Sequence, residues 1–262
     1  MNAGYYRLVH RNDAGEAVFE SSELTASVWG PDLQHGSPPL ALLTREIEEL
    51  LADSGQRIGR LSLDILGAIP VAPVKVRAWV QRPGRRIRLL EAEMRAGDDD
   101  RPVARLSAWA LATTDSTAVS TDRHSPLIEG PSLPPPAWFD QSTGYAKSVR
   151  WRAQPDSPDG AAVAWLRPQV PLSDDRPTTA LQRLAMVVDS ANGIGAALPV
   201  DEYIFMNTDT VVHLHRLPTG DDFGMRARAS IGPDGIGATT AELFDHTGFI
   251  GTSAQTLLVQ KR

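Results

Sequence analysis

The chain has 262 residues, a formal net charge of -6 at pH 7 and no cysteine. Its length fits one large domain or two small ones, and 42% hydrophobic residues can build a core. The acidic balance argues against nucleic-acid binding, and the absence of cysteine excludes disulfides, thiolate nucleophiles and cysteine zinc sites. Neither a signal-peptide pattern nor ~18 consecutive apolar residues occurs, so we expect a soluble cytoplasmic protein that does not bind membranes.

The first half of the chain predicts strands, one helix and then more strands. Strand-like sequence covers residues 4 to 10 and 16 to 29. The spacing of apolar residues predicts a helix over 37 to 55, with Ser37 as its cap and prolines in its first turn, where a missing N–H costs nothing. Four strand-like segments follow: RLSLDILGAI, VKVRAWVQ, IRLLEAEMRA and VARLSAWALA.

The second half repeats this plan. A second helix is predicted from Thr178 or Thr179 to about Ala197, and four strand-like segments follow it: IFMNTDTVVHLHR, FGMRARASI, GATTAELFD and GTSAQTLLVQ. Some sequence also matches between the halves, since VRAWVQRPG resembles MRARASIGPDG. The proline-rich stretch SPLIEGPSLPPPAWFDQSTG separates the halves.

An internal duplication explains this plan. We expect an N-terminal unit over residues 1–115, a connector over 116–143 and a C-terminal unit over 144–262 that carries the main catalytic set. An antiparallel sheet wrapped around one long helix is the hot-dog fold. The predicted class is therefore α+β, a double hot-dog with two antiparallel sheets, each wrapped around a long central helix.

The sequence resembles a known family in both halves. LQHGSPPLALLTR is similar to the start of the hot-dog helix in type II, double hot-dog acyl-CoA thioesterases, and VVDSANGIGAAL, NTDTVVHLHRLPTG, AELFD and GTSAQTLLVQ are similar to their second half. The resemblance covers nearly the whole chain and keeps the family's order. It implies hydrolysis of an acyl-CoA thioester to a free acid and CoA.

The resemblance also implies a catalytic set: an aspartate on the second helix, a threonine on the next strand and a glutamine near the end of the last strand. The aspartate corresponds to Asp189 and the glutamine to Gln255. Counting back from His215-Arg216, the threonine position falls on Asn207, with Thr208 beside it. Asparagine can hold a water molecule but cannot relay a proton as a hydroxyl can.

The residues themselves give Asp189 two interpretations. It interrupts an apolar helix face after Val187 and Val188, where burial should raise its pKa and suit it to act as a base. Alternatively, it is a structural aspartate that binds neighbouring backbone N–H groups. Gln255 lies in an otherwise apolar strand and either orients a water or is a satisfied buried amide.

His35 and Gly36 are candidates for substrate binding because they precede the first helix. N–H groups at a helix start favour a developing negative charge, and Gly36 would allow a thioester carbonyl to come close. The alternative is a plain loop-to-helix turn. His213 and His215 could form a metal site with Asp209, but a structural, subunit-contact or site-lining role is favoured. We expect no metal and no cofactor.

Three functions remain open. The leading one is acyl-CoA hydrolysis by a water held between Asp189, Gln255 and Asn207. The second is an enoyl-thioester hydratase or dehydratase, which also uses a double hot-dog. The third is an acyl-thioester-binding protein without activity, which Asn207 in place of a hydroxyl residue would favour. Exposed sheet edges often pair further, so a homo-oligomer is also expected.

Overall fold

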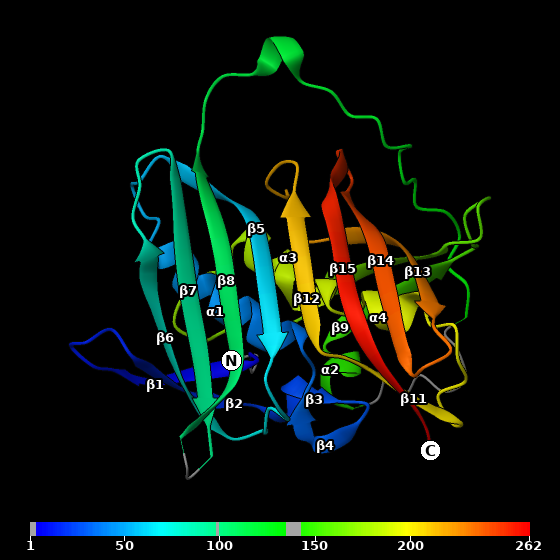
Figure 1. The fold of residues 1–262 in the computed structure, drawn as a ribbon, viewed down its shortest axis with the longest axis horizontal. Coiled ribbons are helices and arrows are strands. Elements are labelled where there is room, and N and C mark those ends of the chain that lie inside the picture. Colours follow the sequence, from blue (N-terminus) through cyan, green and yellow to red (C-terminus); the bar gives the residue numbers. More distant parts are fainter. Residues whose placement is uncertain (1–3, 98–99, 135–142) are drawn as a thin grey trace.

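The computed structural model describes residues 4–97, 100–134 and 143–262, so residues 135–142 of the expected connector lie outside the described part. The predicted α+β class is confirmed: antiparallel strands and helices make up the fold (Figure 1). The main strands of the first half are β1 (Tyr6–Arg11), β2 (Ala17–Ser21), β5 (Gln56–Ile65), β6 (Pro73–Arg82), β7 (Ile87–Ala96) and β8 (Arg101–Ala112). Those of the second half are β9 (Val149–Gln154), β10 (Ala162–Pro168), β12 (Asp209–Leu214), β13 (Phe223–Ile231), β14 (Ile236–Asp245) and β15 (Gly248–Lys261).

These strands form one continuous sheet. Its order is β1-β2-β6-β7-β8-β5 in the first half and β12-β15-β14-β13-β10-β9 in the second, so both halves show the same pairing order from their outer edge to the centre. This symmetry is what a duplicated unit predicts. Strand β6 takes the same place in its half as β13, in agreement with the sequence match between them.

The expectation of two separate sheets is wrong. Strand β5 pairs antiparallel with β12, with Leu61 opposite Val212, and this pairing joins the two halves. An unpaired edge strand exposes a row of N–H and C=O groups that another edge can satisfy. Here the two inner edges satisfy each other, and the sheet edges lie at β1 and β9.

The helices lie on one face of this sheet. They are α1 (Ser37–Glu49), α2 (Gly144–Lys147), α3 (Ala180–Val188) and α4 (Ala191–Ile194). Helix α1 packs against β6, β7, β8 and α3, and α3 also packs against β10 (Figure 1). No helix among the described residues is long and apolar enough to cross a bilayer.

The predicted second helix is interrupted. Thr179 and Gln182 form a capping box that begins α3, which fits the predicted start. The helix ends at Val188, because the N–H of Asp189 and that of Ser190 both bond to the carbonyl of Val187 and tighten the last turn. A separate short helix, α4, follows. The first helix is also shorter than predicted and ends at Glu49.

The remaining elements are short. They are the β3 (Ala26–Ser27) and β4 (Gly30–Gln34) hairpin, strand β11 (Tyr203–Asn207), which pairs with β15, and the 3-10 turns η1 (Glu23–Thr25) and η2 (Thr117–Val119). The hairpin leads directly into α1, and β11 follows α4, so both lie next to the helix ends. They are therefore positioned to frame a site between the two halves.

A buried arginine also links the halves. The Arg45 side chain on α1 is 1% exposed and donates from both terminal nitrogens to Asp175 at 2.8 and 2.7 Å, and to the Ser173 hydroxyl at 2.6 Å. Its guanidinium also lies 5.0 Å from the centre of the Phe19 ring. Burial alone would raise the pKa of Asp175, but the hydrogen bonds from Arg45 and Ser173 lower it to about 2.

Replacing Arg45 with methionine should lower the free energy of unfolding by on the order of 3 kcal/mol near pH 7, because Asp175 loses its two-nitrogen partner while partly buried. The folded-state pKa of Asp175 is below its unfolded value, so the pair's contribution is present above pH ~4 and is lost as pH falls through about 2. Urea unfolding at a series of pH values should show that the difference in unfolding free energy between the variant and wild type shrinks as the pH falls from 7 towards 2. Arg7→Met, at an exposed ion pair with Glu20, is the control, and an equal loss there would contradict the prediction.

Candidate functional site

Asp189 lies at the end of α3, where its residue is only 4% exposed. A buried carboxylate is costly unless hydrogen bonds compensate it. Its Oδ1 atom accepts three of them: from Asn207 Nδ2 at 2.7 Å, from the Thr210 hydroxyl at 2.5 Å and from Gln255 Nε2 at 3.2 Å. These donors compensate the carboxylate for the loss of contact with water.

The donors come from three neighbouring strands. Asn207 ends β11, Thr210 lies on β12 and Gln255 on β15, and β15 pairs with both other strands. The Gln255 amide also donates to the backbone carbonyl of Asp189 and to the Thr210 hydroxyl, both at 3.0 Å. Since that carbonyl and Oδ1 can only accept, Nε2 must face them. Gln255 Oε1 is left buried, without a hydrogen-bond partner among the described residues.

The structure therefore brings Asp189, Gln255 and Asn207 together, as the sequence predicts, and adds a hydroxyl that the sequence reading missed. Thr210, not Thr208, supplies it: the Thr208 hydroxyl is exposed and lies 3.3 Å from Asp209 Oδ1. The alternating pattern of β12 contains the missed signal. Thr210 is buried on the same face as Val212 and Leu214, and a polar side chain on an apolar face is a candidate for a site.

The second oxygen of Asp189 faces the start of α1. Oδ2 forms no hydrogen bond with any described residue, and it lies next to Gly36: a Cβ atom built on Gly36 would be 2.5 Å from it. The φ angle of Gly36 is -65°, which any residue can adopt. Glycine is therefore required at this position for space. Sequence reasoning predicted a close approach to Gly36 by a substrate carbonyl, which stays a prediction, and the structure shows a close approach by the Asp189 carboxylate.

His35 borders the same oxygen and is held in one orientation. Its Nδ1 accepts the N–H of Ser37 at 3.1 Å and lies 3.7 Å from Asp189 Oδ2. The ring stacks on Tyr145 with centroids 3.8 Å apart, and the Tyr145 hydroxyl is fixed by the Met186 carbonyl at 2.9 Å. Burial lowers the pKa of His35, although the charge of Asp189 opposes this effect. A neutral ring that accepts at Nδ1 carries its proton on Nε2.

Few N–H groups remain available at the start of α1. Pro38 and Pro39 have none, Ser37 donates to His35, and Leu40 donates to the carbonyl of Gly36. The N–H of Gly36 has no acceptor among the described residues. This group lies next to Asp189 and is one donor suited to an oxyanion.

A cavity of about 900 Å³ opens beside this group. It touches the site at His35, Tyr145 and Ser190 and extends between η1, the β3–β4 hairpin, α2, α4 and the strands β9 and β10. Its size is in the range of ~300–1,000 Å³ that is typical of small-molecule sites. His35 and Ser190, which line this cavity, are thus the link between it and the buried carboxylate: His35 lies 3.7 Å from Asp189 Oδ2, and Ser190 follows Asp189 in the chain.

Sequence profiles place the chain in a family. Residues 25–111 match the profile of the acyl-CoA thioesterase N-terminal domain, and residues 121–259 match that of the acyl-CoA thioesterase C-terminal domain. The chain belongs to the acyl-CoA thioesterase family. The resemblance read from the sequence is thereby confirmed.

Solved structures, among them two TesB-type proteins, share the fold along nearly the whole chain. The acyl-CoA thioesterase II TesB2 from Mycobacterium marinum is 14% identical with a TM-score of 0.70, and 97% of this chain and 95% of that chain are covered. The tesB protein of Mycobacterium avium subs paratuberculosis is 15% identical, with a TM-score of 0.67 and coverages of 97% and 96%. A hot-dog protein of unknown function from Alicyclobacillus acidocaldarius is 16% identical, with a TM-score of 0.74 and coverages of 97% and 95%. A search of curated proteins gave no match.

The alternative metal site at His213 and His215 has no counterpart in the structure. Both side chains are exposed on the outer face of the sheet, and the His215 ring packs edge-on against Phe249, with centroids 5.7 Å apart. Among the described residues, the one group of three potential metal ligands consists of Glu129, Asp222 and His246. It therefore includes none of His213, His215 and Asp209.

Gly36→Ala should destabilise the protein by about 1–3 kcal/mol, because the added Cβ overlaps the Asp189 carboxylate and forces it from its three donors. Urea unfolding measures the change. Gly193→Ala is the matched control: Gly193 is also helical, and a Cβ there meets nothing within 4 Å, so it should cause no loss. Equal stability of Gly36→Ala and wild type would show that the contact between Gly36 and the Asp189 carboxylate does not require glycine.

Proposed function

We propose that this thioesterase-family chain hydrolyses an acyl-CoA thioester to a free acid and CoA, with Asp189 as the general base. One observation carries the proposal: Oδ1 of the buried carboxylate has three donors, while Oδ2 has none among the described residues and lies beside Gly36, whose N–H has no acceptor there. One oxygen is thus fixed, and the other is available for the proton of a water molecule. A base with an N–H donor beside it suits attack on a carbonyl.

The reaction proceeds in two steps. A water oxygen attacks the thioester carbonyl carbon while Asp189 Oδ2 takes one of its protons, which gives a tetrahedral oxyanion. The carbonyl then re-forms, the C–S bond breaks, and Asp189 returns the proton to the departing CoA sulfur. The products are a carboxylic acid and CoA thiol, and Asp189 is ionised again.

The three donors have different roles in this scheme. Asn207 and Thr210 hold the carboxylate, so Asn207 positions the base and does not replace the hydroxyl. Gln255 uses its NH2 group on Asp189, and its unpartnered Oε1 is the acceptor for the second hydrogen of the attacking water. A water that is bound through both hydrogens presents its lone pair to the substrate.

Two donors from the first half receive the oxyanion in this scheme: the N–H of Gly36 and the Nε2–H of His35. Neutral imidazole is a good donor here because the stack on Tyr145 and the bond from Ser37 fix its plane before substrate arrives. The catalytic carboxylate thus belongs to the C-terminal unit, residues 144–262, and the oxyanion donors belong to the N-terminal unit, residues 1–115. In the same proposal, α1 and α3 are the central helices of the two hot-dog units.

Release of CoA thiol from a panel of acyl-CoAs tests the proposed function. Asp189→Asn should lower kcat about 10²–10⁴-fold, because the amide cannot accept the proton. Thr210→Val should lower kcat about 10–100-fold by removing a charge-assisted hydrogen bond. Thr208→Val, at the exposed neighbouring threonine, should retain wild-type activity.

The alternatives give different results in the same experiment. Addition of water to a crotonyl-type thioester without thiol release would favour the hydratase, and saturable acyl-CoA binding without either reaction would favour the inactive binding protein. Thiol release that is unchanged in Asp189→Asn would refute Asp189 as the base.

His35→Phe tests the second oxyanion donor. Phenylalanine can retain the stack on Tyr145 but has no N–H, so kcat should fall about 10²–10³-fold with little change in KM. Since the pKa of His35 is lowered by burial, wild-type kcat/KM should show no histidine titration between pH 7 and 8. A His35→Phe enzyme with normal kcat would exclude this role.

A further inference from the structure

The end of the connector crosses the C-terminal half as an arm, defined here as residues 124–134. It begins at His124, whose ring stacks on Phe249 at 3.6 Å and whose Nδ1 lies 3.1 Å from Glu242 Oε1. Further along, the N–H of Gly130 donates to Gln154 at 2.7 Å, and the N–H of Leu133 donates to the Ala153 carbonyl, also at 2.7 Å. The connector descends along the side of the second half that carries β13 (Figure 1).

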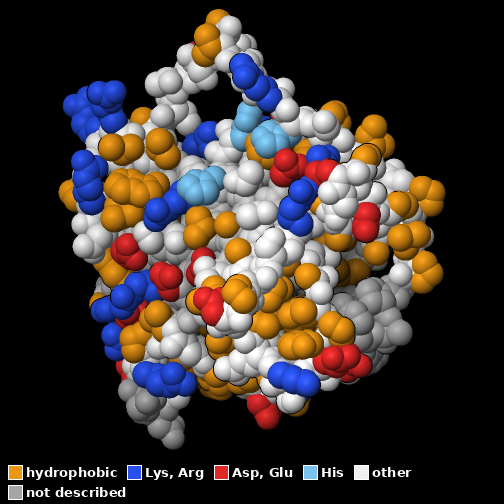
Figure 2. All heavy atoms as spheres, turned by 45° about the vertical axis from the view of Figure 1, so that its right-hand side comes forward, with side chains coloured by type: hydrophobic (Ala, Val, Ile, Leu, Met, Phe, Trp, Pro, Cys, Tyr) orange, Lys and Arg blue, Asp and Glu red, His pale blue; other side chains and the backbone are white. Residues whose placement is uncertain are grey.

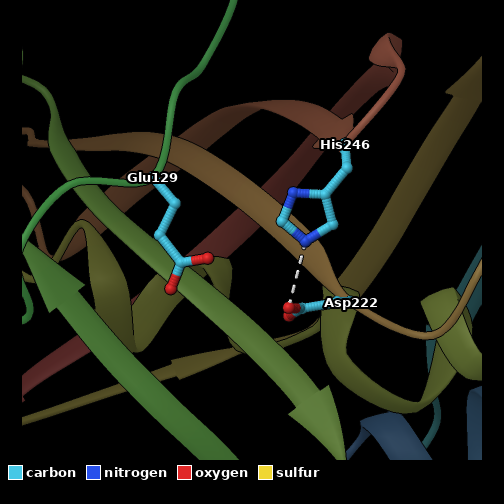
Figure 3. A group of neighbouring side chains, drawn as sticks. All are labelled: Glu129, Asp222 and His246. Atoms are coloured by element: carbon cyan, nitrogen blue, oxygen red, sulfur yellow. Dashed lines mark hydrogen bonds and ion pairs between the residues drawn. The ribbon is translucent and has the colours of Figure 1, made fainter.

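A group of charged side chains fastens the middle of the connector arm. Figure 3 shows Glu129, from the arm, beside Asp222 and His246, and His246 Nε2 lies 3.2 Å from Asp222 Oδ2. Arg152 on β9 donates to Glu129 and, at 2.7 Å, to both carboxylate oxygens of Asp222. The ligand atoms of the three labelled residues lie within 4.8 Å of one another, as in a metal site. The guanidinium of Arg152 already pairs with both carboxylates, so we treat Glu129, Arg152 and Asp222 as an ion-pair latch.

The end of the arm reaches the cavity beside the catalytic site. Leu133 and Pro134 line this cavity, and so do Ala153 and Gln154, the two β9 residues to which the arm is hydrogen-bonded. At its other side the cavity touches His35, next to Asp189. The arm therefore forms part of the cavity wall.

The lining of the cavity favours an acyl group over the CoA nucleotide. Much of its lining consists of small or apolar side chains: Leu24, Trp151, Ala153, Ala162, Ala164 and Ile194. Its full charges are one lysine, Lys147, and two acids, Glu23 and Asp156, all on exposed residues. Phosphate recognition needs a surplus of cations, which these three do not provide. Figure 2 shows hydrophobic side chains gathered over the lower part of the face that it presents.

We propose that the connector arm is a wall of the acyl cavity, that Leu133 limits the size of the acyl group, and that the Glu129–Arg152 pair positions this wall. The inference rests on the proposed thioesterase function and names its substrate class: acyl-CoAs with a long or ring-bearing apolar acyl group. Each methylene that becomes buried in the cavity should raise kcat/KM by up to about fourfold. Wild-type kcat/KM should therefore rise from acetyl-CoA to octanoyl- and decanoyl-CoA.

Two variants of the full chain test this wall with the same acyl-CoAs, from acetyl-CoA to decanoyl-CoA. Glu129→Gln loosens the latch and should raise KM for decanoyl-CoA about tenfold, with kcat retained and acetyl-CoA hydrolysis unchanged. Leu133→Trp narrows the cavity and should lower kcat/KM for decanoyl-CoA but not for acetyl-CoA. A purely structural role would instead change the rates for all chain lengths equally.

Glu242→Gln is the matched control for the latch. Its side chain is 34% exposed, against 29% for Glu129, and it binds the connector at His124, away from the cavity. Its chain-length profile should equal that of wild type. Decanoyl-CoA hydrolysis that is unchanged in both Glu129→Gln and Leu133→Trp would overturn the wall while leaving the thioesterase intact. A wild type that hydrolyses no acyl-CoA would overturn the proposed function and this inference with it.

Discussion

The carboxylate of Asp189 sets the strongest constraint on this molecule. Helix α3 brings a carboxyl group into a region of buried side chains, and such a group is tolerated only where hydrogen-bond partners meet it. Here three side chains from β11, β12 and β15 donate to one oxygen. The three hydrogen bonds to Oδ1 therefore require one register of these strands and one position for the break between α3 and α4.

The other oxygen of Asp189 couples the two halves. It lies so close to Gly36 that a Cβ would overlap it, so the first and second halves must keep one relative position. The pairing of β5 with β12 and the buried Arg45–Asp175 ion pair both stabilise that position. In the proposed mechanism a fused chain has an advantage, because its two units can differ: one supplies the base and the other supplies the oxyanion donors.

The connector has a larger role in this structure than that of a spacer. Proline-rich sequence between two units is usually interpreted as a linker. Residues 124–134 instead follow the C-terminal unit through a ring stack, an ion-pair latch and two backbone hydrogen bonds, and they end at the cavity. Variation in such a segment could change the acyl cavity without altering Asp189 or its donors.

The sequence by itself determined the α+β class, the repeated plan of strands and helices, and the residues Asp189, Gln255, Asn207, His35 and Gly36 as site candidates. Apolar periodicity and an out-of-place polar residue are local properties, and the sequence displays them directly. The tertiary structure alone decided that the two sheets are continuous, that the second helix breaks at Asp189, and that Thr210 supplies the hydroxyl. It also decided that Gly36 must leave room for a carboxylate. These features depend on which strands pair and in what register, and Gln255 meets Asp189 across 66 residues of chain. Periodicity tells which face of a strand is buried but not which distant group lies opposite it.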